Sequence, residues 1–280
     1  MILAEENLFL IVLAVVWIIG AIMQDMKRRE VDNIWNFSLL LFALAYRLAY
    51  SIHSQEYWFF VNGILGLIVF VVLGNLFYYS QVFAGGDAKL LIALGGIMPL
   101  SYDWIINLKL FGSFIGLFLF GGAVYVLFFA LVLVCLHWKK FSMEFIKRSL
   151  KIKTAYIFGF LLFLIWAIIS FFIGTEVILF GVIFILFPIL LAFSKAVEES
   201  CLIVNTPLNK ITEGDWLYKD ITVGGKKIKA HWEGLSKQQL IFIQKKHRGP
   251  ILIKQGIPFT PSFLIGLIGI ILLDYWWGWF

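Results

Sequence analysis

Residues 110–136 have the sequence LFGSFIGLFLFGGAVYVLFFALVLVCL, which runs for more than 20 positions without a charged side chain. About 20 consecutive apolar residues form a helix long enough to cross the hydrocarbon core of a bilayer, which is about 30 Å thick. This stretch therefore predicts a transmembrane helix. It also sets the standard against which the other apolar stretches of the chain are compared.

Seven further apolar stretches resemble this one, and together the eight predict a polytopic all-α membrane protein. The candidates are residues 8–23, 35–52, 58–79, 88–105, 110–136, 155–173, 177–193 and 261–273. The fourth contains Gly95, Gly96 and Pro99, which favours a short or broken helix. Residues 1–7, before the first stretch, contain Glu5 and Glu6 but no Lys or Arg, so we expect a retained helix and not a cleaved signal peptide.

Composition supports the same class of protein. The chain has 280 residues, of which 61% are hydrophobic and 14% charged, and its mean hydropathy is +0.93. Soluble domains have about 45–50% apolar and about 25% charged residues, so a soluble fold and a disordered chain are both excluded. The two cysteines, Cys135 and Cys201, provide no CxxC pair and no disulfide framework.

The net charge of +6 predicts orientation and gives no indication of nucleic-acid binding. With the N-terminus outside, 21 of the 23 Lys and Arg residues lie in loops on the cytoplasmic side, and only Arg47 and Lys109 do not. Such a bias sets the orientation of membrane proteins. We therefore expect a multi-pass protein of the cell membrane.

The one long polar stretch, residues 195–257, predicts a small cytoplasmic α+β module. Gly224-Gly225 between two short apolar-alternating segments predicts a tight hairpin, and Ser236 with Gln239 is a capping-box signature of a helix start. We accordingly divide the chain into a membrane domain, the module and a last helix, at residues 1–194, 195–257 and 258–280. The aromatic residues of 274–280 predict an interfacial belt at the outer surface.

Two acids near the membrane are candidates for chemistry because charges at that depth are costly. Asp25 ends the first predicted helix and Asp87 follows the third, so successive crossings bring both to the same leaflet. Two adjacent carboxylates share one proton, and such a pair can activate water for attack on a peptide carbonyl without a metal or cofactor. Gly85 and Gly86 before Asp87 would let the backbone of a substrate approach closely.

Each acid also has a simpler interpretation. Asp25 could be an interfacial residue before a basic loop, and Asp87 could be the N-cap of the fourth helix. Lys89 is more often a snorkelling lysine than a catalytic one, so we give it at most a supporting role.

The motif residues 85–90, GGDAKL, together with Gln24-Asp25, Ile34 and Asn36, resemble the GxGD membrane aspartyl proteases that process type IV prepilins and archaeal preflagellins. Ala84 departs from the glycine that this family has at the first position of its motif. The resemblance implies that Asp25 and Asp87 are the catalytic pair.

Stretches of the C-terminal part, ITEGDW at 211–216 and GIPFTP at 256–261, are similar to the archaeal branch of that family. The absence of a cysteine-rich loop implies a peptidase without methyltransferase activity. Residues 154–194 look like an extra helical hairpin relative to six-helix members.

The resemblance implies cleavage of the short basic leader of membrane-inserted archaellin or pilin precursors, at the cytoplasmic face and before their hydrophobic N-terminal helix. Glu30 and Asp32 could bind the basic leader, although they could equally be solvated loop residues. Two other functions remain open. Intramembrane acids and a broken helix also occur in proton- or cation-coupled transporters. A membrane scaffold would explain the charge bias but not the placement of Asp25 and Asp87.

Overall fold

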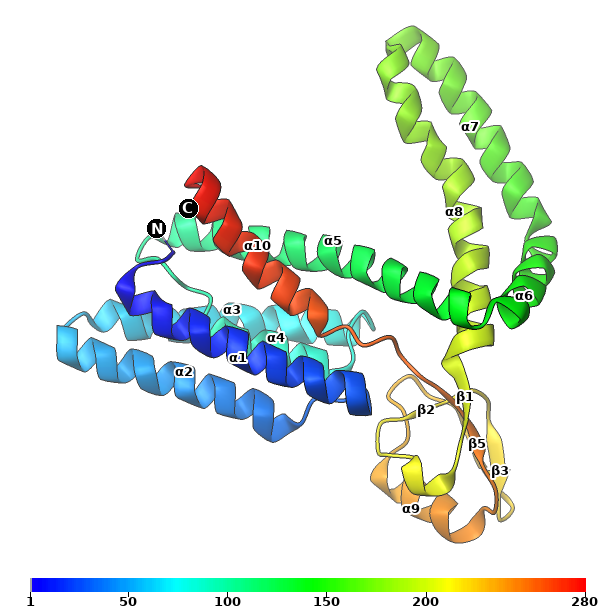
Figure 1. Ribbon diagram of the computed structural model, residues 1–280, viewed down its shortest axis with the longest axis horizontal. Helices are drawn as coiled ribbons and strands as arrows, with labels where there is room; N and C mark the ends of the chain where they lie inside the picture. Colours follow the sequence, from blue (N-terminus) through cyan, green and yellow to red (C-terminus); the bar gives the residue numbers. More distant parts are fainter. Residues whose placement is uncertain (1) are drawn as a thin grey trace. The chain divides into compact units, whose positions relative to one another are not determined.

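The computed structural model describes residues 2–280 and divides the chain into two compact units. The first unit comprises Met1–Phe128 and Ile257–Phe280, and the second comprises Phe129–Gly256. The chain is mostly helical, with a small sheet-containing module in its C-terminal part (Figure 1). The functional division into a membrane domain, a module and a last helix remains a prediction.

A helical bundle makes up the first unit. Its elements are α1 (Glu5–Arg28), α2 (Asn33–Ser54), α3 (Tyr57–Tyr79), α4 (Gly85–Gly95), the first part of α5 (Trp104–Leu136) and α10 (Pro261–Trp277). Helix α10 packs against α1, and α4 packs against both α2 and α3. The core is apolar and rich in phenylalanine, with Phe70, Phe114, Phe118 and Phe263 fully buried.

Six helices in the described part of the chain are long and apolar enough to span a membrane, so the predicted count of eight is not confirmed. The six are α1, α2, α3, α5, α7 (Lys153–Ile173) and the continuous segment Ile178–Leu202, which includes α8 (Ile178–Val197). The eighth predicted span, α10, has 17 residues and falls below that length.

The fourth predicted span is the short helix α4, followed by an irregular segment over residues 96–103. Its 11 residues extend for about 16 Å, roughly half of a hydrocarbon core. The break follows Gly95-Gly96 and precedes Pro99, as these helix-breaking residues predict. Loosened backbone at this depth needs hydrogen-bond partners from the protein.

Arg47 supplies these partners. Its side chain is fully buried on α2, and its guanidinium donates to the carbonyl oxygens of Gly96 at 2.7 Å, Ile97 at 3.0 Å and Pro99 at 2.5 Å. A further bond of 2.7 Å goes to the carbonyl of Phe59 at the start of α3. Arg47 therefore provides hydrogen-bond donors for the backbone carbonyls that follow α4 and links this segment to α2 and α3.

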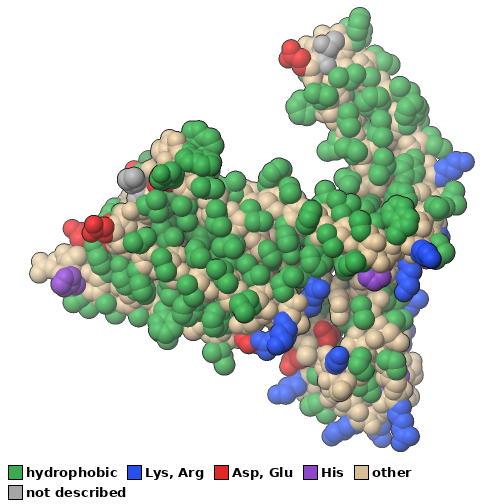
Figure 2. All heavy atoms as spheres, viewed as in Figure 1, with side chains coloured by type: hydrophobic (Ala, Val, Ile, Leu, Met, Phe, Trp, Pro, Cys, Tyr) green, Lys and Arg blue, Asp and Glu red, His purple; other side chains and the backbone are tan. Residues whose placement is uncertain are grey.

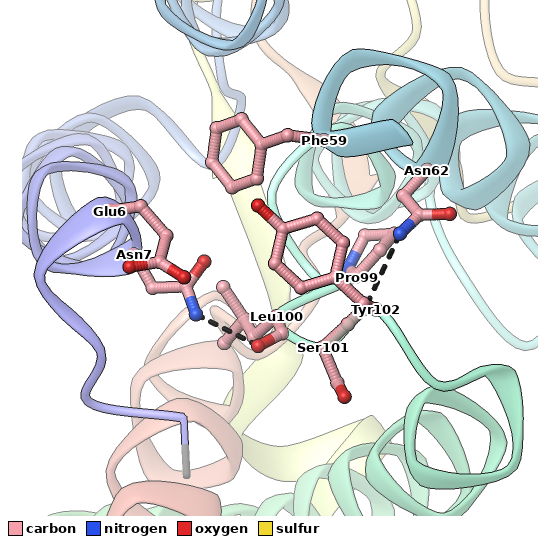
Figure 3. A pocket seen from close by; sticks show the side chains of 8 residues that line it. All are labelled: Glu6, Asn7, Phe59, Asn62, Pro99, Leu100, Ser101 and Tyr102. Atoms are coloured by element: carbon pink, nitrogen blue, oxygen red, sulfur yellow. Dashed lines mark hydrogen bonds between the residues drawn. The ribbon is translucent and has the colours of Figure 1, made fainter. Parts of the chain in front are cut away.

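The segment after α4 reaches the end of the bundle at which α1 and α3 begin. Asn7, in the first turns of α1, donates to the carbonyl of Leu100 at 2.8 Å, and Asn62, near the start of α3, donates to that of Ser101 at 3.2 Å (Figure 3). Helix α4 and its irregular continuation together therefore run the length of the bundle.

The second unit contains the end of α5, the amphipathic helix α6 (Trp138–Lys151), and a hairpin of α7 and α8 joined through the short helix η1 (Thr175–Val177). Helices α7 and α8 pack side by side (Figure 1). The π-helical turn η2 (Glu198–Leu202) continues α8. The hairpin coincides with the extra pair of helices expected from the sequence, whereas α6 was not predicted.

The α+β module follows η2. Its antiparallel sheet has the order β1 (Ile203–Thr206), β5 (Ile251–Lys254), β2 (Trp216–Leu217), beside the short helix η3 (Leu208–Lys210). The hairpin β3 (Ile221–Val223) and β4 (Lys226–Ile228) turns at Gly224 and Gly225, both with positive φ. Helix α9 (Lys237–Lys246) begins with the predicted capping box of Ser236 and Gln239. Both local predictions are confirmed.

Candidate functional site

Asp25 lies in the last turns of α1 with only 7% of its surface exposed. Its Oδ2 atom accepts two hydrogen bonds from Thr260, one from the hydroxyl at 3.0 Å and one from the backbone amide at 3.3 Å. Thr260 is fully buried at the N-cap of α10. The side chain of an N-cap threonine ordinarily caps its own helix, but this one makes no such bond and instead binds Asp25.

Thr260 is a residue that the sequence reasoning did not single out. The Thr260-Pro261 pair before an apolar stretch indicates a helix start, because proline favours the first position of a helix. That signal marks where α10 begins. It does not indicate the hydrogen-bond partner of Thr260, which is Asp25, 235 positions earlier in the chain.

Asp87 lies in the first turn of α4, where the positive end of the helix dipole favours a carboxylate. The N-cap of α4 is Ala84, so the interpretation of Asp87 as the N-cap is wrong: the helix begins at Gly85, two residues before the acid. Ala84 has φ −68° and ψ 160°, an extended conformation that alanine adopts without strain. The absence of the family glycine at this position therefore imposes no backbone penalty.

The two acids belong to the same compact unit and interact electrostatically. Asp87 precedes the apolar part of α4 and lies outside the six candidate spans. Burial raises the pKa of its carboxyl group to about 7, and the negative charge of Asp25 adds to the rise. A carboxyl group that keeps its proton near neutral pH and interacts with a second carboxyl group is suited to general acid and base catalysis.

The glycines before Asp87 are not required by the packing of the protein itself. A Cβ atom at Gly85 would come no closer than 3.7 Å to Tyr78, and one at Gly86 would lie 3.4 Å from the amide nitrogen of Val31. The side chain of Asn36, on α2, donates to the carbonyl of Gly86 at 3.2 Å and holds the turn in place. The admission of a substrate by Gly85 and Gly86 therefore remains a prediction that the fold leaves room for.

The remaining predicted residues lie around the same end of the bundle. The Lys89 ammonium donates to Asn33 Oδ1 at 2.7 Å and so links α4 to the start of α2. Asp32 pairs with Arg28 at 2.6 Å, with both side chains about half exposed, and Glu30 is exposed in the same connection. The binding of a basic leader by Glu30 and Asp32 remains a prediction.

A small pocket lies at the opposite end of α1 and is unsuited to a ligand of any size. Its cavity volume is about 10 Å³, room for about one water molecule, whereas ligand pockets usually measure about 300–1,000 Å³. The residues that line it are Glu6, Asn7, Phe59, Asn62, Pro99, Leu100, Ser101 and Tyr102 (Figure 3). Within residues 2–280, no group of three or more His, Cys, Asp or Glu side chains gathers that could hold a metal ion.

Comparison with known proteins connects the bundle to one family. A model of the type IV leader peptidase family matches residues 11–137, which include Asp25, Asp87 and Lys89. No solved structure matches the chain.

Two preflagellin peptidases are similar to parts of the chain. A preflagellin peptidase of Methanococcus maripaludis is 27% identical over 162 residues, which cover 50% of this chain and 70% of that protein. A preflagellin peptidase of Methanocaldococcus jannaschii is 33% identical over 89 residues, which cover 30% of this chain and 38% of that protein. The family match and both relatives agree: the chain is similar to type IV leader peptidases and preflagellin peptidases, which are proteases.

Proposed function

We propose that this protease removes the short basic leader peptide of preflagellin-like or type IV prepilin-like precursors at the cytoplasmic face of the membrane, with Asp25 and Asp87 as its catalytic pair. The observation that carries the proposal is the electrostatic effect of Asp25 on Asp87, two carboxyl groups that belong to α1 and α4 of the same compact unit. The family match over both residues and the names of the two relatives support it.

The surroundings of the two acids indicate how they divide the chemistry. One oxygen of Asp25 accepts both donors of Thr260, and we assign to the other oxygen the role of taking a proton from water. Asp87 holds its proton near neutral pH and can donate it to the carbonyl oxygen of the scissile bond. The attacking water thus loses a proton to Asp25, and the leaving amine receives one as the C–N bond breaks.

The same end of the bundle fits a basic leader attached to an apolar helix. In this proposal the positive charges of the leader lie near Glu30 and Asp32, where Asp32 exchanges its half-exposed ion pair with Arg28 for the leader. The apolar helix that follows the leader stays in the bilayer. Cleavage between these two parts requires an active site at the membrane surface, at the level where α1 ends and α4 begins.

The direct test is incubation of the purified protein with a preflagellin that carries its leader, followed by sequencing of the product's N-terminus. We expect one cut after the basic leader, and loss of at least about 10³-fold in rate for Asp25→Asn and for Asp87→Asn, because each removes one half of a proton-transfer pair. Asp103→Asn is the matched control, because Asp103 is an exposed acid that caps α5 through its carboxylate oxygen, and asparagine keeps that acceptor. Cleavage retained in either active-site variant refutes the pair.

A transporter is the second candidate, favoured by the broken helix α4. In transporters, the unwound carbonyls at such a break coordinate the ion. Here the carbonyls of Gly96, Ile97 and Pro99 already accept hydrogen bonds from Arg47. Proton or sodium flux into liposomes that Asp25→Asn abolishes, in a protein that cleaves no precursor, would favour transport over proteolysis.

A further inference from the structure

Helix α6 has a position that its connections determine. It follows α5 after the single residue His137 and precedes α7 after the single residue Ile152, and both flanking helices are candidate membrane spans. With one connecting residue at each end, α6 cannot move away from the surface at which α5 and α7 end. Where α5 and α7 span the bilayer, these short connections hold α6 beside the membrane surface.

One side of α6 is taken up by contacts within its own unit. Phe141 is buried and stacks edge-on against Phe193 of α8, with 5.6 Å between the ring centroids. Arg148 forms an ion pair of 2.6 Å with Glu199 in η2, and both side chains are largely covered. These contacts fix the rotation of α6 about its axis.

The other side of α6 presents a row of apolar side chains beside a row of lysines. Met143, Ile146 and Leu150 are 65%, 60% and 70% exposed, and their spacing places them on one face. Lys140, Lys147 and Lys151 follow a neighbouring line along the helix and are exposed as well. Glu144, the single acid of α6, pairs with Lys147 at 2.9 Å.

We propose that α6 is an interfacial anchor that binds anionic phospholipid headgroups, with Met143, Ile146 and Leu150 inserted at the acyl boundary and the lysine row at the headgroups. A basic amphipathic helix that lies in the plane of the bilayer binds in this way, through buried apolar area and attraction to anionic lipid. The bilayer is the occupant because α5 and α7 place it directly beside α6. Figure 2 shows Lys and Arg side chains around α6 and mainly hydrophobic ones over α7 and α8. The proposal is independent of the peptidase function.

A spin label reports the depth of the apolar row. The native Cys135 and Cys201 are replaced by alanine, and the label is attached at Ile146→Cys or Leu150→Cys in the full chain, in vesicles of phosphatidylcholine with phosphatidylglycerol. We expect both labels to be more accessible to oxygen than to a nickel chelate, as in hydrocarbon. The control label at Lys227→Cys, on the exposed surface of β4, shows the reverse. Water-like accessibility at 146 and 150, or protection from both reagents as in a protein contact, overturns the proposal.

Lipid selectivity tests the lysine row. Spin-labelled phosphatidylglycerol and phosphatidylcholine compete for the protein surface, and we expect the wild type to retain phosphatidylglycerol several-fold better. Replacement of Lys140, Lys147 and Lys151 by glutamine brings the two lipids to equal retention. The matched control removes the same charge from three exposed lysines of the module, Lys229, Lys237 and Lys245, and keeps the preference. Equal loss in both variants, or no loss in the α6 variant, contradicts a site on α6.

Discussion

Two hydrogen bonds from Thr260 to Asp25 connect residues from the first and last helices of the bundle. When its acceptor is ionised, the hydrogen bond from the hydroxyl contributes about 1.5–3 kcal/mol to stability, which is more than a bond between neutral groups. Charge-assisted hydrogen bonds are shorter and stronger. Thr260 touches the proposed base and does not contact the reacting bond, so we regard it as a positioning residue.

Thr260→Val tests this role because valine keeps the shape of threonine and the backbone amide but removes the hydroxyl. We expect kcat for leader cleavage to fall by about 10- to 100-fold with little change in KM, since about 1.4 kcal/mol corresponds to a factor of ten. Thr260→Ser, which restores the hydroxyl, is expected to recover most of kcat. If both variants lower kcat equally while thermal unfolding is unchanged, the hydroxyl does not position Asp25.

The pKa of Asp87 predicts the alkaline limb of the pH profile. The proposed mechanism needs the proton on Asp87, and because its pKa is raised to about 7, the proton persists above the usual carboxyl range and is lost as the pH rises through that value. We therefore expect kcat/KM to be retained between pH 5 and about 7 and to fall about tenfold for each further pH unit. A fall that already begins near pH 5, with the fold intact by circular dichroism, would contradict a raised pKa.

Among single residues, the sequence predicted those that are costly in a membrane and missed those that act through tertiary contacts. Asp25 and Asp87 stand out because few acids occur beside apolar stretches. Thr260 and Arg47 do not: a threonine before proline indicates only a helix start, and Arg47 was notable only for lying outside the basic loops. Their partners are distant in the chain, and hydropathy gives no information on such pairs.

At the level of elements, local rules predicted local structure. The Gly224-Gly225 turn and the Ser236 capping box depend on neighbours within four residues, and both form as predicted. The fourth span was overextended because hydropathy counts apolar side chains and is insensitive to where the backbone leaves the helix. Helix α6 was missed because its lysines interrupt the apolar pattern that identifies a span.

We expect Arg47 to stabilise the broken helix α4. Arg47→Met keeps the length of the side chain but leaves the carbonyls of Gly96, Ile97, Pro99 and Phe59 without their donor. Each buried carbonyl that loses its hydrogen-bond partner lowers the free energy of unfolding by about 1–3 kcal/mol. We therefore expect this free energy to fall by several kcal/mol, with a marked fall in the unfolding temperature in detergent.

Two variants make the Arg47 measurement specific. Arg47→Lys keeps the charge but has a compact ammonium group in place of the planar guanidinium, so we expect an intermediate fall in the unfolding temperature. Lys109→Met removes the other basic residue outside the Lys-rich loops, which is exposed, and should change the unfolding temperature little. Equal unfolding temperatures for Arg47→Met and Lys109→Met would show that the four bonds do not support α4.

For the whole molecule, the orientation depends on α4 counting as a crossing. The hydrogen bonds from Asn7 and Asn62 place the residues after α4 at the end of the bundle where α1 and α3 begin. Six long helices, the short α4 with its irregular continuation and the 17-residue α10 then alternate as the eight predicted spans would. The charge bias of the loops depends on this alternation, whereas the predicted meeting of Asp25 and Asp87 in one leaflet depends only on the first three crossings.

Accessibility of single cysteines in sealed, right-side-out vesicles tests the alternation directly. In a background without Cys135 and Cys201, we expect a membrane-impermeant thiol reagent to label Glu56→Cys and Asp103→Cys from outside, and Lys147→Cys only after the vesicles are opened. Glu56 and Asp103 are both exposed and flank the stretch that contains α3, α4 and the irregular segment. If α4 turns back without crossing, Asp103→Cys is protected while Glu56→Cys is labelled. The second unit would then be inverted, with the lysines of α6 on the outer surface, against the rule that basic loops remain in the cytoplasm.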